Sequence, residues 1–305
     1  MSELASEDHL TNAIRRIERL ARCEPENRRF ASFADTGHLL PAAAELLAGE
    51  RIVLTTGFCI RSAMIGETDG PPGTLALADA LRQLGKKVVL LTDKHSIGLV
   101  TAGALVFGGS PFTTVTLCQE QGAADCQIQS LLASFSPTQV VAIERPGSAA
   151  DGHRYSMRGE ILDDLIPATD RLLDPVGPRS YRTIAVGDGG NELGFGSLRE
   201  ALKNKVAHGE LIFCATPADY VIPAGISNWG AYALAAALSL QAGRLLIRPP
   251  EHEHAVLQAL LAAGAVDGAT RKHELSVDGL GWQDYASTIA TIYEETRMGL
   301  ELIGN

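Results

Sequence analysis

The sequence predicts an α/β protein of three layers, in which a mostly parallel sheet carries helices on both faces. Short apolar runs alternate with segments whose apolar residues recur at helical spacing, which is the pattern of strand–helix–strand units. Most apolar runs also end in glycine or polar residues, as strands do at the ligand-binding edge of such sheets. With 46% hydrophobic content, the 305 residues can form a large core. We expect a Rossmann-like fold without a dinucleotide fingerprint, because the G-x-G-x-x-G match beginning at Gly187 has Glu192 at its last position.

The chain begins with an amphipathic helix. Its apolar residues between Leu10 and Ala21 recur at helical spacing, arginines occupy the other face, and Pro25 marks its end. A second, short helix is predicted at Pro41–Leu47. We therefore expect a helical segment over residues 1–48 and an α/β domain over residues 49–305, together forming one continuous compact unit.

The remaining elements alternate along the chain. The predicted strands are Arg51–Thr55, Lys87–Leu91, Thr113–Leu117, Gln139–Ile143, Thr183–Val186 and Leu211–Cys214. The predicted helices are Gly73–Leu84, Ser96–Phe107, Ala123–Phe135, Glu160–Ile166, Ser197–Lys203, Ser227–Gln241, Glu253–Ala263 and Gln283–Leu302.

Composition excludes several classes of function. A net charge of -10 argues against nucleic-acid binding, which needs a basic face. No signal peptide is expected, because Met1–Asp8 has no apolar core, and the apolar run Ala231–Leu240 is too short to cross a bilayer. The five cysteines form no C-x-x-C pair, so we expect reduced thiols in a cytoplasmic protein.

The most informative motif follows the predicted strand Thr183–Val186. Four glycines are interspersed there with Asp188, Asn191 and Glu192. Glycine allows a tight turn and a close approach of ligand to backbone. The structural alternative is an acidic turn that caps the next helix.

Two other strand ends carry similar chemistry. Glu144 follows a buried run, so it must be protonated, bound to a metal, or paired with Arg145 or Arg158. After the first strand come Thr56 and Gly57, and then the string E-T-D-G-P-P-G at residues 67–73, which enters a helix. Asn228 begins a later helix, where it can cap the helix or line a pocket.

Familiar catalytic motifs are absent from the sequence. It contains no G-x-x-x-x-G-K-[ST] phosphate loop, no G-x-S-x-G elbow and no H-E-x-x-H pair. ATP-driven activation is therefore not expected.

Together these segments resemble the D-glutamate cyclase family. The strings that carry the resemblance are Thr56–Phe58, Glu67–Gly73, Glu144–Gly147, Ala150–Gly152, Met157–Gly159, Gly187–Gly194, Pro217–Asp219, Pro223–Gly230 and Val277–Leu280. The resemblance implies conversion of D-glutamate to 5-oxo-D-proline with loss of water, a hydro-lyase reaction. Members of the family have also been proposed to be manganese-dependent phosphatases.

On this hypothesis a divalent cation, Mn²⁺ or Mg²⁺, polarises the substrate carboxylate. The candidate metal ligands are Glu144, Asp188, Glu192 and the amide of Asn191. The candidate catalytic residues are Asp151 or Asp69 as general base, together with Glu67. The candidate substrate-binding residues are Thr56, Gly57, Gly73 at its helix start, Arg145 or Arg158 as a carboxylate clamp, and Asn228.

Two other functions stay open at this point. The same site could hydrolyse phosphate esters through a metal-bound water, or the protein could bind an acidic metabolite without catalysis. In each case the expected partner is a small acidic molecule rather than nucleic acid or membrane. We also expect a homo-oligomer, although no motif specifies its interface.

Overall fold

The computed structural model describes residues 3–25, 30–174 and 178–304. Its strands are β1 (Arg51–Thr56), β2 (Cys59–Ile60), β3 (Ile65–Gly66), β4 (Lys87–Asp93), β5 (Thr113–Leu117), β6 (Gln139–Ile143), β7 (Arg182–Gly187), β8 (Tyr220–Pro223), β9 (Ser276–Val277) and β10 (Leu280–Gly281). Its α-helices are α1 (Glu3–Ala21), α2 (Leu39–Ala48), α3 (Pro71–Gln83), α4 (Ile97–Val106), α5 (Gln121–Phe135), α6 (Arg199–Leu202), α7 (Gly209–Ile212), α8 (Ser227–Gln241), α9 (Pro250–Ala262) and α10 (Trp282–Gly304). Short 3₁₀ helices lie at Ala31–Phe33, Asp170–Leu172, Gly196–Leu198 and Lys203–Lys205.

Six strands form one sheet in the order β5-β4-β1-β6-β7-β8, and every neighbouring pair is parallel. The chain starts at β1 in the middle, builds outward to β5, and then returns to place β6 on the other side of β1. The order therefore reverses between β1 and β6. Open α/β sheets bind their ligands at the carboxyl ends of the strands that flank such a switch point.

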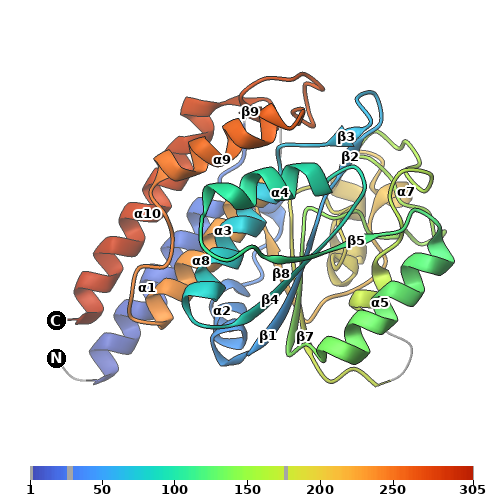
Figure 1. The fold of residues 1–305 in the computed structure, drawn as a ribbon. Coiled ribbons are helices and arrows are strands. Elements are labelled where there is room, and N and C mark those ends of the chain that lie inside the picture. Colours follow the sequence, from blue (N-terminus) through green and yellow to red (C-terminus); the bar gives the residue numbers. More distant parts are fainter. Residues whose placement is uncertain (1–2, 26–29, 175–177, 305) are drawn as a thin grey trace.

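Helices cover both faces of the sheet (Figure 1), as the sequence predicts. On one face α3 and α8 pack on Ile52, Leu54, Val141 and neighbouring side chains, and helices α1, α2, α4, α9 and α10 extend the same core. On the other face α5 packs on the side chains that alternate with these, including Val53 and Val140. The helix α1 lies against α8 and α10, so the first helix of the chain contacts the last.

Two of the predicted elements are wrong. The apolar run Leu211–Cys214 is not a strand: it comprises the end of α7 and a buried extended segment, and the sixth strand is β8. Glu160–Ile166 does not form a helix: Ile161 makes an isolated β-bridge with Tyr155, and one turn follows at residues 163–165. The segment predicted as one helix at Ser197–Lys203 is divided into a 3₁₀ turn, the short α6 and a second 3₁₀ turn.

The contact between α3 and α8 depends on Gly73. A Cβ at this position would lie 2.8 Å from both the Cα of Asn228 and the Cβ of Ala231. We expect Gly73→Ala to lower the free energy of unfolding by about 1–3 kcal/mol, because the helices would have to move apart. Urea denaturation measures this loss. Gly98→Ala in α4 is the control, since a Cβ there meets nothing within 4 Å; equal stability of the two variants would contradict the prediction.

Candidate functional site

Three carboxylates from three different loops meet at the carboxyl edge of the sheet. Asp69 precedes α3, Glu144 follows β6 and Asp188 follows β7. Oxygen atoms of the three side chains lie within 4.8 Å of one another, and all three side chains are buried. We call this group the acidic trio. It lies at the switch point beside β1 and β6, where this class of sheet binds ligands.

The trio concentrates negative charge away from water. Burial raises the pKa of Asp69 well above its usual value, and the neighbouring charges of Asp278 and Asp188 raise it further. Burial, followed by the charge of Asp188, also raises the pKa of Glu144 well above its usual value. Protons or a cation must therefore offset part of this charge. Carboxylate oxygens are the ligands that Mg²⁺ and Mn²⁺ prefer, so the residues present fit such an ion.

Two helices are joined to the trio by reciprocal caps. The Asp69 carboxylate accepts hydrogen bonds from the backbone N–H groups of Ser227 and Asn228 at the start of α8 (3.0 and 2.8 Å). In return, the Asn228 side-chain oxygen accepts from the N–H groups of Gly70 and Gly73 at the start of α3 (both 2.9 Å). The positive ends of both helix dipoles are therefore directed at the acidic trio, where they stabilise negative charge.

Glu144 adopts a backbone conformation that side chains rarely tolerate. Its φ is +43°, in the left-handed region, and the Ser227 hydroxyl donates a hydrogen bond to its carboxylate. Its neighbour Gly70 has φ +95°, and a Cβ there would lie 2.7 Å from both the Thr56 hydroxyl oxygen and the Cβ of Glu144. Strain of this kind is typical of functional sites.

Two buried polar atoms, one beside Glu144 and one in the loop that carries Asp188, point to a ligand. The Thr56 hydroxyl and the side-chain oxygen of Asn191 have no hydrogen-bond partner among the described residues. Thr56 is 2% exposed and Asn191 is 1% exposed. Thr56 lies beside Glu144, and a Cβ on Gly189, next to Asp188, would lie 2.9 Å from the Asn191 oxygen. Buried polar atoms normally find a partner, so both are available to a bound molecule or ion.

The predicted metal ligands divide into two groups. Glu144 and Asp188 are in the trio. The Glu192 carboxylate instead accepts from the backbone N–H groups of Asp188, Gly189 and Gly190 (3.0, 2.7 and 2.6 Å), so it shapes the loop that carries Asp188. Asn191 donates through its amide nitrogen to the backbone oxygen of Tyr155 (2.8 Å).

The predicted arginine clamp is engaged elsewhere. Arg145 is fully buried, forms an ion pair with the equally buried Asp93, and donates to the backbone oxygens of Gly57 and Pro167. Arg158 is exposed and donates to the backbone oxygen of Ala269 (2.9 Å). The backbone N–H of Gly73 and the side-chain oxygen of Asn228, also predicted to bind substrate, are committed to the caps described above, and the Asn228 amide nitrogen donates to the backbone oxygen of Thr68 (3.1 Å).

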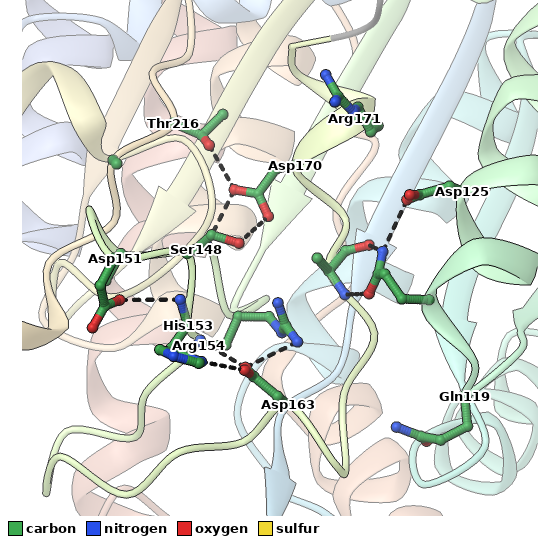
Figure 2. A pocket seen from close by; sticks show the side chains of 15 residues that line it. Gln119, Asp125, Ser148, Asp151, His153, Arg154, Asp163, Asp170, Arg171 and Thr216 are labelled. Atoms are coloured by element: carbon green, nitrogen blue, oxygen red, sulfur yellow. Dashed lines mark hydrogen bonds and ion pairs between the residues drawn. The ribbon is translucent and has the colours of Figure 1, made fainter.

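Asp151 lies apart from the trio. It lines a cavity of about 690 Å³, shown in Figure 2, to which none of the trio contributes. Its carboxylate is exposed and accepts from the Tyr155 hydroxyl (2.6 Å), a hydrogen bond that lowers its pKa. The other acids of this cavity are also paired: Asp125 with Gln121, Asp163 with His153 and Arg154, and Asp170 with Ser148 and Thr216. The structure therefore brings Asp69, and not Asp151, to the predicted metal ligands.

Two residues near the trio were not predicted as site residues. Ser227 binds Glu144, and Asp278 contributes the largest neighbouring charge to the raised pKa of Asp69. Asp278 and Gly279 lie between apolar residues, which is a sequence signal for a hairpin turn. That signal predicts the β9–β10 turn but not the position of this turn relative to the sheet.

The fold and the candidate site together define a class: doubly wound α/β proteins with a group of buried carboxylates at the switch point of the sheet. Within it, the chain belongs to the D-glutamate cyclase-like family, since the family profile described as D-glutamate cyclase-like, C-terminal, matches residues 17–293. It is also similar to the human protein named D-glutamate cyclase, mitochondrial, with 35% identity over 237 residues. The alignment covers 74% of this chain and 38% of the human protein, so the chain spans less than half the length of that relative.

No helix within the described residues has the length and apolar character needed to cross a membrane. All five cysteines are free, with Cys59 and Cys214 buried.

Proposed function

We propose that the protein is a hydro-lyase that converts D-glutamate to 5-oxo-D-proline and water, using Mn²⁺ or Mg²⁺ held by the acidic trio. The observation that carries the proposal is the meeting of Asp69, Glu144 and Asp188 at the switch point of the sheet. Membership of a family named for this enzyme supports the choice of substrate.

The reaction balances without a cosubstrate. The α-nitrogen forms a bond to the γ-carboxyl carbon, and one γ-oxygen leaves as water. The ammonium group supplies the two protons that water takes, and its third proton stays on the lactam nitrogen. A carboxylate is a poor electrophile, and a bound divalent cation would polarise it and offset the charge that builds on its oxygens.

The chain's own groups would bind and orient the substrate. Asp69, Glu144 and Asp188 would supply the oxygen ligands, and the backbone N–H groups at the start of α8 hold Asp69 in place. The Thr56 hydroxyl can donate to a substrate carboxylate oxygen. Glu67 is buried and its charge acts on Asp69, so we assign it the transfer of protons from nitrogen to the leaving oxygen. Because ring closure is intramolecular, holding the bent substrate supplies much of the acceleration.

The direct test uses chelator-treated protein incubated with D-glutamate, with and without Mn²⁺ or Mg²⁺. We expect 5-oxoproline only with a cation, and none from L-glutamate. Mn²⁺ alone should raise the melting temperature, since a ligand at 100 times its Kd stabilises the folded state by about 2.7 kcal/mol.

Absence of 5-oxoproline with either cation rejects the proposal. Metal-dependent hydrolysis of phosphate esters under those conditions would instead assign a phosphatase. Stabilisation by D-glutamate without product would indicate a binding protein.

We further propose that the protein acts in the cytoplasm, where its five free thiols stay reduced, and that it assembles as a homo-oligomer. Cell fractionation tests the compartment, and light scattering tests the assembly.

A further inference from the structure

Ser227 donates hydrogen bonds to two of the three carboxylates of the acidic trio. Its backbone N–H donates to Asp69 (3.0 Å), and its hydroxyl donates to Glu144 (2.5 Å). Ser227 is the first residue of α8 and is fully buried. One residue therefore joins two carboxylates that come from different loops of the chain.

The two carboxylates depend on Ser227 to different degrees. Asp69 also accepts from the backbone N–H groups of Gly70 and Asn228 (3.0 and 2.8 Å). For the Glu144 carboxylate, the Ser227 hydroxyl is the only hydrogen-bond donor within the part of the chain that the structure describes. Loss of this hydroxyl would therefore leave Asp69 held by three backbone groups and the Glu144 carboxylate without a donor.

The base of the Glu144 side chain is fixed by packing, whereas its carboxylate is not. A Cβ on Gly70 would lie 2.7 Å from the Cβ of Glu144 and 3.3 Å from its Cγ, so the loop of Asp69 lies against these atoms. Oxygen atoms of Asp69, Glu144 and Asp188 lie within 4.8 Å of one another, a separation at which like charges repel. A charge-assisted hydrogen bond from Ser227 opposes this repulsion and holds the Glu144 carboxylate in the trio.

The hydroxyl of Ser227 does not serve its own helix. It donates to Glu144, on another loop, and no side chain of the residue before α8 caps the helix start. The other serine of α8, Ser239, is also fully buried, but its hydroxyl donates to the backbone oxygen of Ala235 (2.9 Å) and accepts from the N–H of Leu246 (3.0 Å). The two serines therefore separate a bond to the trio from bonds that only stabilise the fold.

We propose that Ser227 is a positioning residue for the metal site: its hydroxyl holds the Glu144 carboxylate beside Asp69 and Asp188, so that a divalent cation meets three oxygen ligands. This inference rests on the proposed function and adds the residue on which the affinity for the cation depends. Groups that hydrogen-bond to metal ligands orient them, and their loss commonly weakens metal binding about 10–100-fold.

The test measures Mn²⁺ binding to chelator-treated wild type, Ser227→Ala and Ser239→Ala by titration calorimetry. For Ser227→Ala we expect the Kd for Mn²⁺ to rise about 10–100-fold, because the Glu144 carboxylate loses its donor while the backbone bond to Asp69 is kept. Ser239→Ala is the matched control, since it removes a buried hydroxyl from the same helix about three turns away. It should lower stability in urea and leave the Kd unchanged.

A third variant, Ser227→Thr, keeps the hydroxyl and should restore the wild-type Kd. Its extra methyl group enters a fully buried position, so circular dichroism first establishes that the variant is folded. If it is not folded, the two alanine variants decide the question.

An unchanged Kd in Ser227→Ala would overturn the proposal, and so would a wild type that binds neither Mn²⁺ nor Mg²⁺. Equal losses of affinity in the two alanine variants, or a folded Ser227→Thr that binds as weakly as Ser227→Ala, would also overturn it. Because calorimetry measures binding without turnover, the proposed function fails separately. A protein whose Mn²⁺ affinity depends on Ser227 but which forms no 5-oxoproline would keep the positioning residue and reject the reaction.

Discussion

Replacing Glu144 by glutamine is expected to abolish formation of 5-oxoproline while making the metal-free protein more stable. The substitution removes one of three buried, mutually repelling carboxylates but keeps an oxygen that accepts from the Ser227 hydroxyl. At neutral pH the melting temperature of the metal-free protein should rise, because burial and the charge of Asp188 raise the pKa of Glu144 well above its usual value, so that ionisation at this position costs stability. The stabilisation by Mn²⁺ should be lost. Melting curves with and without Mn²⁺, and a product assay, measure these effects.

Glu253→Gln is the matched control, because Glu253 is also buried but lies outside the site and accepts from the Tyr285 hydroxyl. Burial raises the pKa of Glu253 to about 7. The unfolded value is about 4.3, so the folded state binds the proton more tightly, and ionisation costs stability as pH rises between the two values. The control should therefore gain stability at pH 8 but not at pH 4, and should keep both activity and the Mn²⁺ effect. An Mn²⁺ effect that survives in Glu144→Gln would contradict the metal assignment.

Replacing Arg145 by methionine is expected to lower the free energy of unfolding by about 3–5 kcal/mol. The change leaves Asp93 as an uncompensated charge at 0% exposure and removes the donor to the backbone oxygens of Gly57 and Pro167. Urea denaturation measures the loss. Arg61→Met is the control: its ion pair with Asp164 is exposed, and such pairs contribute at most about 1 kcal/mol. A fully stable Arg145→Met variant with a raised KM alone would instead support a substrate clamp.

The strands show which parts of the fold the sequence could predict. Five of the six sheet strands are apolar runs ending in polar or glycine residues, and the structure confirms them. The run Leu211–Cys214 has the same composition and is buried at Ile212, Phe213 and Cys214, yet it lies outside the sheet. A short apolar run indicates burial, and its periodicity does not distinguish a strand from a buried turn.

The candidate site, like the fold, could be predicted from the sequence only in part. Glu144 and Asp188 could be placed because each directly follows a strand, and parallel strands end at one edge. Asp151 lies in a long irregular segment between β6 and β7, whose path over the surface no local pattern specifies. Glu192 has the carboxylate that a metal ligand needs. Its sequence position does not reveal that this carboxylate accepts hydrogen bonds from the backbone of its own loop.

The reciprocal caps between the starts of α3 and α8 have a consequence for biosynthesis. Asp69, Glu144 and Asp188 all leave the ribosome before Asn228, but Asp69 is held by backbone groups of residues 227 and 228, and the loop of Asp69 is held by Asn228. A nascent chain therefore cannot assemble the site step by step as its strands appear. The carboxylates take up their final arrangement only after residue 228 has been translated.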